Sequence, residues 1–208
     1  MPRDARTTRA SLLRAGARLF AEQGIDAART RDIVALAGQG NDSAITYHFG
    51  SRRGLLAAIL GAGVARMEPA RQAALETLDG ADPHALVAAV VGPIADELRT
   101  EEGRHFLRIV AQVAGRSGVR GHTVPELIAG TAIARQLELL EKNLLGSLPE
   151  PVALERIAMM IAFLTAALAD RAVQVTTGQA APLLGHEEFR AELTAMLSAA
   201  LTAPAANA

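Results

Sequence analysis

Gly and Pro interrupt this chain of 208 residues at short intervals, and between them the apolar residues recur at helical spacing. Val and Ile are scattered among Ala, Leu, Arg and Glu, without the strict alternation of a half-buried strand. Ala is abundant and is the best helix former, and 50% of all residues are hydrophobic, so helices can pack into a substantial core. The sequence therefore predicts an all-α protein of about nine helices.

The breakers give the approximate bounds of these helices. Pro69 should kink or end the fourth helix, because its ring removes one hydrogen bond and clashes with the preceding turn. The tail at 204–208 should be disordered. We expect helices at about 8–23, 30–37, 43–49, 52–67 with a kinked continuation or new start at 70–78, 83–99, 103–116, 124–145, 150–178 and 187–202.

Several classes of protein are disfavoured by the composition. The chain has no Cys, so it has no disulfide, zinc-thiolate site or thiol chemistry. Its N-terminus is basic and polar, unlike a secretory signal. Apolar stretches such as Ile157 to Leu168 are too short to span a bilayer. We expect a cytoplasmic protein that does not insert into a membrane.

An all-helical enzyme is an alternative with little support. The five His lie far apart in the sequence and form no His-x-x-x-His pair. No phosphate-binding glycine loop of the Walker type occurs. We therefore expect no catalysis, no metal and no cofactor.

Charge is distributed unevenly along the chain. Residues 1–66 carry a net charge of +5 and residues 67–208 carry −6, although the total is only −1. A basic head on an acidic body suggests an anionic partner for the head alone. Chance clustering of solvated charges is the alternative.

The first three predicted helices form a helix-turn-helix unit within about fifty residues. In the third helix, Ile45 and Phe49 are four residues apart, so both should point to the core and Tyr47 should point outward. Small and polar residues around Tyr47 suit close approach to a DNA groove. In the second helix, the residues expected to face inward are Ile33, Leu36 and Ala37.

Caps and charges surround the third helix. Asn41 or Asp42 is placed to cap it, because short polar side chains accept the free N–H groups of a first turn. Ser51 is placed to cap the next helix. Arg52 follows it, where the side chain and the helix N-terminus can both meet a phosphate. A flexible basic arm would precede the first helix and contain Arg3, Arg6 and Arg9.

Residues across this segment resemble the N-terminal domain of TetR-family transcriptional regulators. The matching positions lie within about residues 8–58 and are Gly24, Asp32-Ile33, Ala37-Gly38, Ile45-Thr46-Tyr47-His48-Phe49-Gly50-Ser51-Arg52 and Leu55. The sequence departs from the family pattern at Arg29, where Thr or Ser usually opens the second helix and Thr30 would cap instead. Other departures are Val34 in place of Ala, Thr46 in place of an aromatic residue, and a longer turn at 39–42.

The resemblance implies two domains and a function. A DNA-binding domain would cover residues 6–66, with its motif at about 29–49, and an effector-binding and dimerisation domain would cover 67–203. The chain would be a repressor that a small-molecule effector releases from a pseudo-palindromic operator. An interaction module that kept the fold but lost DNA binding is the alternative. The predicted DNA-binding residues are Asn41, Asp42, Ser43, Ala44, Thr46, Tyr47, His48 and Arg52.

Two apolar stripes near the C-terminus predict the dimer interface. Paired helices from two subunits would form a four-helix contact, with the recognition helices in successive major grooves about 34–36 Å apart. Packing within one chain is the alternative for the same stripes. The predicted interface residues are Leu154, Ile157, Ile161, Leu168, Phe189, Leu193, Met196 and Leu197.

Polar residues on a mostly apolar helix suggest an effector site. His105, Arg108 and Gln112 share one face of the helix at 103–116, and Met159 and Phe163 could complete a pocket. A surface face and an ordinary core are the respective alternatives. Residues 67–208 contain only three aromatic side chains, so an aliphatic or acyl-type effector fits better than a flat aromatic one.

Overall fold

The computed structural model describes residues 2–78, 80, 82–114, 124–178 and 181–205, with side chains from Ala5 onward. Within this part of the chain the regular elements are nine α-helices and one 3-10 helix, and the predicted all-α fold is confirmed. The elements are α1 (Pro2–Gln23), α2 (Thr30–Leu36), α3 (Ser43–Phe49), α4 (Arg52–Leu75), α5 (Pro83–Asp96), η1 (Glu97–Arg99), α6 (Glu101–Val113), α7 (Ala132–Leu145), α8 (Glu150–Thr177) and α9 (His186–Thr202).

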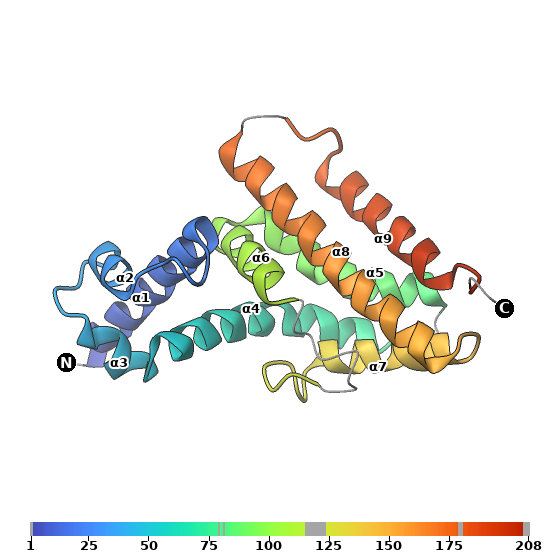
Figure 1. Cartoon of the computed structure of the whole chain (residues 1–208), viewed down its shortest axis with the longest axis horizontal. Helices are drawn as coiled ribbons and strands as arrows, with labels where there is room; N and C mark the ends of the chain where they lie inside the picture. Colours follow the sequence, from blue (N-terminus) through green and yellow to red (C-terminus); the bar gives the residue numbers. More distant parts are fainter. Residues whose placement is uncertain (1, 79, 81, 115–123, 179–180, 206–208) are drawn as a thin grey trace.

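The helices are arranged as a small head at one end of an elongated body (Figure 1). α1, α2 and α3 form the head, and α4 runs from the head along one side of the body. α8 and α9 lie antiparallel along the other side, with α5 and α6 between. α6 packs against both α1 and α8, so it joins the head to the body.

A compact apolar core holds the head together. Phe20 and Leu12 of α1 are fully buried, together with Ile33 of α2, Ile45 of α3 and Leu55 of α4. Large side chains of this kind each contribute about 1.5–3 kcal/mol when they leave water. The head therefore has a core that fixes the orientation of α3, although α2 and α3 are only seven residues long.

Two helices are longer than the sequence predicted. α1 begins at Pro2, so the expected flexible basic arm is the first turns of a helix. α4 continues through Pro69 to Leu75, and no separate helix covers 70–78. Pro69 and Ala65 both lie on the exposed side of α4, where water can bond the Ala65 carbonyl that loses its helical partner.

Other bounds shift at the helix ends. α7 begins at Ala132 rather than near 124, because Pro125 and Gly130 hold the preceding residues in turns. α6 begins at Glu101, where the Thr100 hydroxyl accepts the N–H of Gly103 at 3.0 Å. Its predicted last residues, 115 and 116, lie outside the described residues. α2 has no side-chain cap, and the predicted cap at Thr30 is wrong.

The predicted disordered tail starts in an ordered contact. Arg156 of α8 donates hydrogen bonds to the carbonyl oxygens of Leu201 and Ala203 at 2.7 and 2.5 Å, and to that of Pro204 at 3.0 Å. The guanidinium of Arg156 thus supplies hydrogen bonds to carbonyl groups at the C-terminal end of α9, which have no partner within the helix. Residues 206–208 lie outside the described residues.

α8 is long and apolar enough, by length and composition alone, to cross a membrane. The predicted apolar stretch from Ile157 to Leu168 is only part of α8, which has 28 residues. α8 packs against α6, α7 and α9, and 44% of its most apolar window is buried. α8 therefore has one side buried in the subunit and another side exposed.

Candidate functional site

α3 presents a small polar surface with one aromatic side chain at its centre. Tyr47 is 81% exposed, whereas Ile45 is buried and Phe49 half-buried, as the helical spacing predicted. The rings of Tyr47 and His48 meet edge to face with centroids 4.9 Å apart. Ser43 and Thr46 are also exposed. The outer face of α3 is therefore free to approach a flat or grooved partner closely.

The turn before α3 is held by Asn41. Its side-chain oxygen accepts the N–H of Ser43 at 2.9 Å, and its backbone carbonyl accepts the N–H of Ala44 at 3.0 Å. Asp42 is the N-terminal cap residue but its side chain makes no capping bond. Of the two predicted caps, Asn41 is the one that bonds the first turn.

A tight turn connects α3 to α4. Gly50 has φ +73°, a conformation that other residues rarely adopt, and Ser51 accepts the N–H of Gly54 at 3.0 Å. A Cβ on Gly54 would lie 1.9 Å from the carbonyl oxygen of Phe49. Glycine at this position lets the start of α4 lie against the end of α3. The backbone N–H groups of the first turn of α4 are thereby placed beside the outer face of α3.

Arg52 points into the head instead of toward a partner. Its Nε and Nη2 donate to the carbonyl oxygen of Ala28 at 3.2 and 3.0 Å, and Nη2 also donates to that of Ile25. Its guanidinium lies 5.1 Å from the ring centroid of Phe20. This orientation does not support the predicted phosphate contact, because the donors already bind the loop between α1 and α2. The neighbouring Arg53 is exposed.

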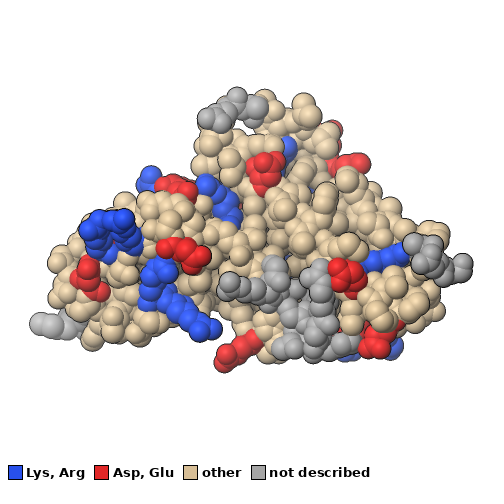
Figure 2. Space-filling model, in the orientation of Figure 1, with Lys and Arg blue, Asp and Glu red and all other residues tan. Residues whose placement is uncertain are grey.

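Exposed arginines surround α3. The guanidinium of Arg9 lies 5.0 Å from the ring centroid of Phe49, and Arg6, Arg29 and Arg53 are also exposed. Among the described residues, no carboxylate forms an ion pair with any of these four arginines. On the face shown in Figure 2, basic side chains gather over the N-terminal helices. The head therefore offers unpaired positive charge to an anion.

Residues 12–59, which contain most of α1, all of α2 and α3, and the start of α4, match the family model described as bacterial regulatory proteins, tetR family. Residues 12–59 therefore form a TetR-type N-terminal domain. The predicted family is confirmed for this N-terminal segment, and α3 is the third of the helices that lie within it. TetR-family regulators are DNA-binding transcriptional regulators, which is the predicted class of function.

Solved structures resemble the whole chain in fold. One is described as a TetR-family transcriptional regulator from Rhodococcus sp.; it has a TM-score of 0.52 and 17% identity, and the match covers 94% of this chain and 99% of that one. Two are described as gamma-butyrolactone receptors, ArpA-like proteins, with TM-scores of 0.53 and 0.52 and identities of 19% and 18%. These matches cover 93% and 94% of this chain and 98% of each of those chains. No curated protein matches the sequence.

The body contains an apolar cavity of about 330 Å³. Its walls come from five helices and from the segment before α7. Thr165 is one of the few polar side chains in the wall, and its hydroxyl already donates to the Ile161 carbonyl at 2.8 Å. The lining residues are Leu60, Val64, Met67 and Arg71 of α4, Val90 and Ile94 of α5, Phe106, Val110, Val113 and Ala114 at α6, Pro125, Leu127 and Ile128, Ile133 and Leu137 of α7, and Ile161, Leu164 and Thr165 of α8.

None of the five residues predicted to bind the effector lines this cavity. His105 lies between α6 and α1, beside Leu36, which is 47% exposed and not inward as predicted. Met159 and Phe163 lie on the outer face of α8. α6 turns its apolar face to the cavity, while its polar residues His105 and Gln112 face the head.

Gln112 of α6 forms hydrogen bonds between the body and the head. Its Oε1 accepts the N–H of Ile25 at 2.7 Å, and its Nε2 donates to the Phe20 carbonyl at 3.1 Å. On the cavity side of α6, a Cβ on Gly63 of α4 would lie 2.2 Å from the Phe106 ring. α6 is therefore fixed to α1 by hydrogen bonds and to α4 by close packing.

Most of the predicted dimer residues pack inside the subunit. The residues buried in its own core are Leu154, Ile157, Leu168, Leu193 and Leu197. Ile161 lines the cavity, and the half-buried Phe189 has the Arg171 guanidinium 4.8 Å from its ring centroid. Met196 alone is exposed, at 49%. Intrachain packing is the better interpretation of those stripes.

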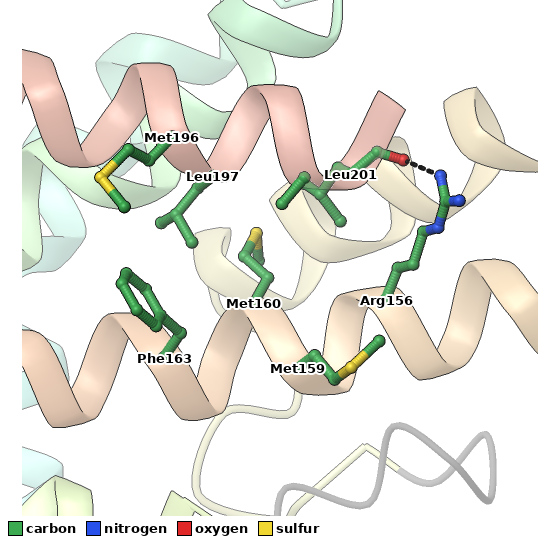
Figure 3. A pocket seen from close by; sticks show the side chains of 8 residues that line it. Arg156, Met159, Met160, Phe163, Met196, Leu197 and Leu201 are labelled. Atoms are coloured by element: carbon green, nitrogen blue, oxygen red, sulfur yellow. Dashed lines mark hydrogen bonds between the residues drawn. The ribbon is translucent and has the colours of Figure 1, made fainter. Parts of the chain in front are cut away.

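A different face of α8 and α9 is apolar and exposed. Phe163 of α8 faces Met196 of α9 across a shallow hollow, and Met159 lies further along α8 near Arg156 (Figure 3). Met160 and Leu197 lie between the two helices and are buried. No charged residue occurs between positions 159 and 166 or between 195 and 200. We name this surface the α8–α9 face; its exposed residues are Met159, Ala162, Phe163, Ala166, Ala195, Met196, Ala199 and Ala200.

No group of three or more His, Asp or Glu side chains suited to a metal occurs in the described part of the chain. Glu102 and His105 lie three residues apart on α6, a spacing found in some metal sites. Glu102, however, binds Arg66 of α4 at 2.7 Å. Arg66 also binds the largely buried Glu97 at 2.5 Å, so these carboxylates hold α4 against η1 and α6.

Proposed function

We propose that this chain is a homodimeric transcriptional repressor that binds a pseudo-palindromic operator through α3 and leaves it when a small molecule occupies the apolar cavity. The observation that carries the proposal is the outward face of α3 beside unpaired arginines in a TetR-family domain. Such a regulator works in the cytoplasm, where its operator is.

Each proposed DNA contact follows from the position of its side chain. Ser43 and Thr46 on the outer face of α3 would meet base edges, with Asn41, Asp42 and the half-buried Ala44 at the N-terminal end of that helix. Tyr47 and His48 would reach the groove wall and backbone. Arg9 and Arg53 would bind phosphates, together with the N–H groups at the start of α4. Arg53 replaces Arg52 in this role.

The dimer would form through the α8–α9 face. Monomeric soluble proteins rarely leave a continuous apolar face of this kind in water. Small alanine side chains on both helices let two copies approach closely, and the face is charge-free at its centre. A two-fold axis there would pair α8 and α9 with the same helices of a second copy and would hold two recognition helices at a fixed separation.

The cavity is the proposed effector site, and α4 and α6 are the proposed route to the head. Both helices line the cavity, α4 leads directly into the turn after α3, and α6 bonds α1 through Gln112. A ligand changes the distance between the two heads only if it binds one arrangement of these helices more tightly than the other. Because a gamma-butyrolactone receptor shares the fold, neutral lactones belong among the ligands to be tested.

The test is a selection from random duplex DNA with the full-length protein, followed by affinity measurements at several salt concentrations. We expect a palindromic consensus and a steep loss of affinity with salt, since bound phosphates release counterions. Ser43→Ala should alter base preference, whereas Tyr47→Ala should weaken the consensus by roughly 1–3 kcal/mol.

Arg135→Ala is the matched control, because Arg135 is exposed on α7, far along the chain from the head. It should leave both affinity and preference unchanged. Failure to enrich any sequence would favour an interaction module that has the fold without DNA binding. A consensus with no two-fold symmetry would contradict the dimer.

A further inference from the structure

We infer that the cavity binds an aliphatic monocarboxylate, with its carboxylate on Arg71 and its alkyl chain among the aliphatic walls. The inference rests on the proposed function, because it names the chemical class of the effector for the same site. It is carried by a buried arginine that lines a largely apolar cavity and pairs with no described carboxylate.

Arg71 is an unusual residue for this position. It lies on α4, it is 3% exposed, and it forms no ion pair with any described carboxylate. Burial lowers its pKa to about 10, while Glu68 on the same helix acts in the opposite direction. An arginine remains charged at this pKa, so the cavity wall contains a buried positive charge that no described carboxylate contacts directly. A buried charge without a counter-ion is costly, and an anionic ligand removes that cost.

The guanidinium is held in place but not saturated. Nη1 donates to Oε1 of the fully buried Gln136 at 2.7 Å and to the Val90 carbonyl at 3.4 Å. Nη2 contacts only the thioether of Met67, at 3.7 Å. A guanidinium has five N–H donors, so donors remain for the two oxygens of a carboxylate. Gln136 in turn donates to the Arg71 carbonyl at 3.4 Å, which fixes the pair.

The rest of the cavity fits an alkyl chain better than an aromatic ring system. The aliphatic wall includes Leu60, Ile94, Val110 and Leu164, and Phe106 is its one aromatic side chain. A volume of about 330 Å³ lies near the lower end of the range for small-molecule sites, roughly 300–1,000 Å³. A medium-chain fatty acid, with one charged end and one flexible apolar end, matches this shape and chemistry.

The experiment is calorimetric titration of the full-length regulator, without DNA, using octanoate, decanoate, decanol and γ-decalactone as probes. We expect decanoate to bind at least roughly tenfold more tightly than either neutral probe, because a charge-assisted hydrogen-bonded pair forms at Arg71. Each added methylene should increase affinity by roughly fourfold, so decanoate should exceed octanoate by over tenfold.

Arg71→Met keeps the bulk and removes the charge. In this variant decanoate should lose its advantage, while decanol should bind as well as before or better. Arg135→Met, one residue from Gln136 but exposed, should change neither affinity. If Arg71→Met does not fold by circular dichroism, the comparison of charged and neutral probes on the wild-type protein still decides the question.

Three results would overturn the inference: equal affinity for decanoate and the neutral probes, tighter binding of γ-decalactone, or no binding of any probe. The same samples are then tested for operator binding, which separates the two proposals. Operator binding without decanoate binding refutes the ligand class alone. Decanoate binding that leaves operator affinity unchanged upholds this site but contradicts its role as the effector site.

Discussion

The head and the body of this regulator differ in how far apart in the sequence their functional residues lie. The proposed reading surface of the head comes from residues 41–53, one short helix and the turns on either side, with Arg9 of α1 beside them. The body forms its cavity from five helices and residues between 60 and 165. A surface built locally can be inferred from spacing, whereas a cavity assembled across the fold depends on which helix faces meet.

The two regions also use charge differently. The exposed arginines of the head are surrounded by water. Their attraction to a polyanion acts at long range and becomes weaker as the salt concentration rises. Arg71 in the body is shielded from water, so its interaction with one small anion is short-ranged and strong. Under the two proposals, arginine would attract DNA of any sequence in the head and would recognise one small anion selectively in the body.

The largest expected effect is on operator binding, when a variant of the body separates the two subunits of the proposed dimer. The double variant Phe163→Arg, Met196→Arg places charges on the α8–α9 face and should give a monomer by analytical ultracentrifugation. Its affinity for a palindromic operator should fall about a thousandfold or more, to the level of non-specific binding.

Leu183→Arg is the control for this variant, because Leu183 is fully exposed but lies in the loop between α8 and α9. It should remain dimeric and bind the operator normally. A double variant that stays dimeric would show that the subunits meet elsewhere.

The next comparison is between two adjacent arginines of the head, Arg52 and Arg53, which we expect to differ in their effects on stability and on DNA binding. Arg52→Ala should lower the free energy of unfolding by about 2–3 kcal/mol, because the carbonyl groups of Ala28 and Ile25 lose a charged donor. Arg53→Ala should leave stability unchanged but weaken binding to all DNA sequences about equally, and should reduce the salt slope by about 1. Urea unfolding and DNA titration measure the two effects, and an exchange of the two results would refute the assignment.

A smaller effect tests the connection between the regions. Gln112→Met removes the hydrogen bonds to Ile25 and Phe20 but leaves the cavity wall intact. Decanoate should bind as before, while the ratio of operator affinities without and with decanoate should shrink roughly fivefold or more. Arg108→Met, on the same helix, should preserve that ratio. An unchanged ratio in Gln112→Met would assign the coupling to α4 alone.

The smallest effect concerns acid stability at the boundary between head and body. Burial lowers the pKa of His105, with Glu101 and Glu22 acting against it. The unfolded chain then binds a proton more readily than the folded one, so stability is retained above the ordinary pKa of 6.5 and falls as pH drops below it. His105→Gln should lose less stability than wild type between pH 7.5 and 5.5 in urea unfolding. Parallel losses in both proteins would contradict the expectation.

The sequence predicted the head well because its signals are local. The spacing of Ile45, Tyr47 and Phe49 gave the outward face of α3 correctly, and the bounds of this helix are as predicted. The inward orientation of Arg52 could also have been predicted from spacing. Arg52 lies three residues before the buried Leu55 and seven before the buried Ile59, so all three lie on the same side of α4.

The body was harder because its helices are apolar on more than one side. The stripe through Leu154 and Leu168 faces the subunit's own core, while the stripe through Met159 and Phe163 faces outward. Periodicity identifies both stripes but cannot tell which one meets a partner. Nothing in the sequence predicted that Arg71 is buried. An arginine on a helix is ordinarily solvated, and only the tertiary packing encloses this one.

The cavity wall has two parts that differ in how they are connected to the head. One part is α4 and α6, which pack closely where Gly63 meets Phe106, and the other is α7. α4 and α6 are both attached to the head, so changes to their lining residues would also disturb the reading of DNA. α7 packs against α4, α5 and α8 instead, and contributes Ile133 and Leu137 to the wall. A biosensor with altered chemical selectivity is therefore best engineered by varying α7 first, which leaves the promoter it reports on unchanged.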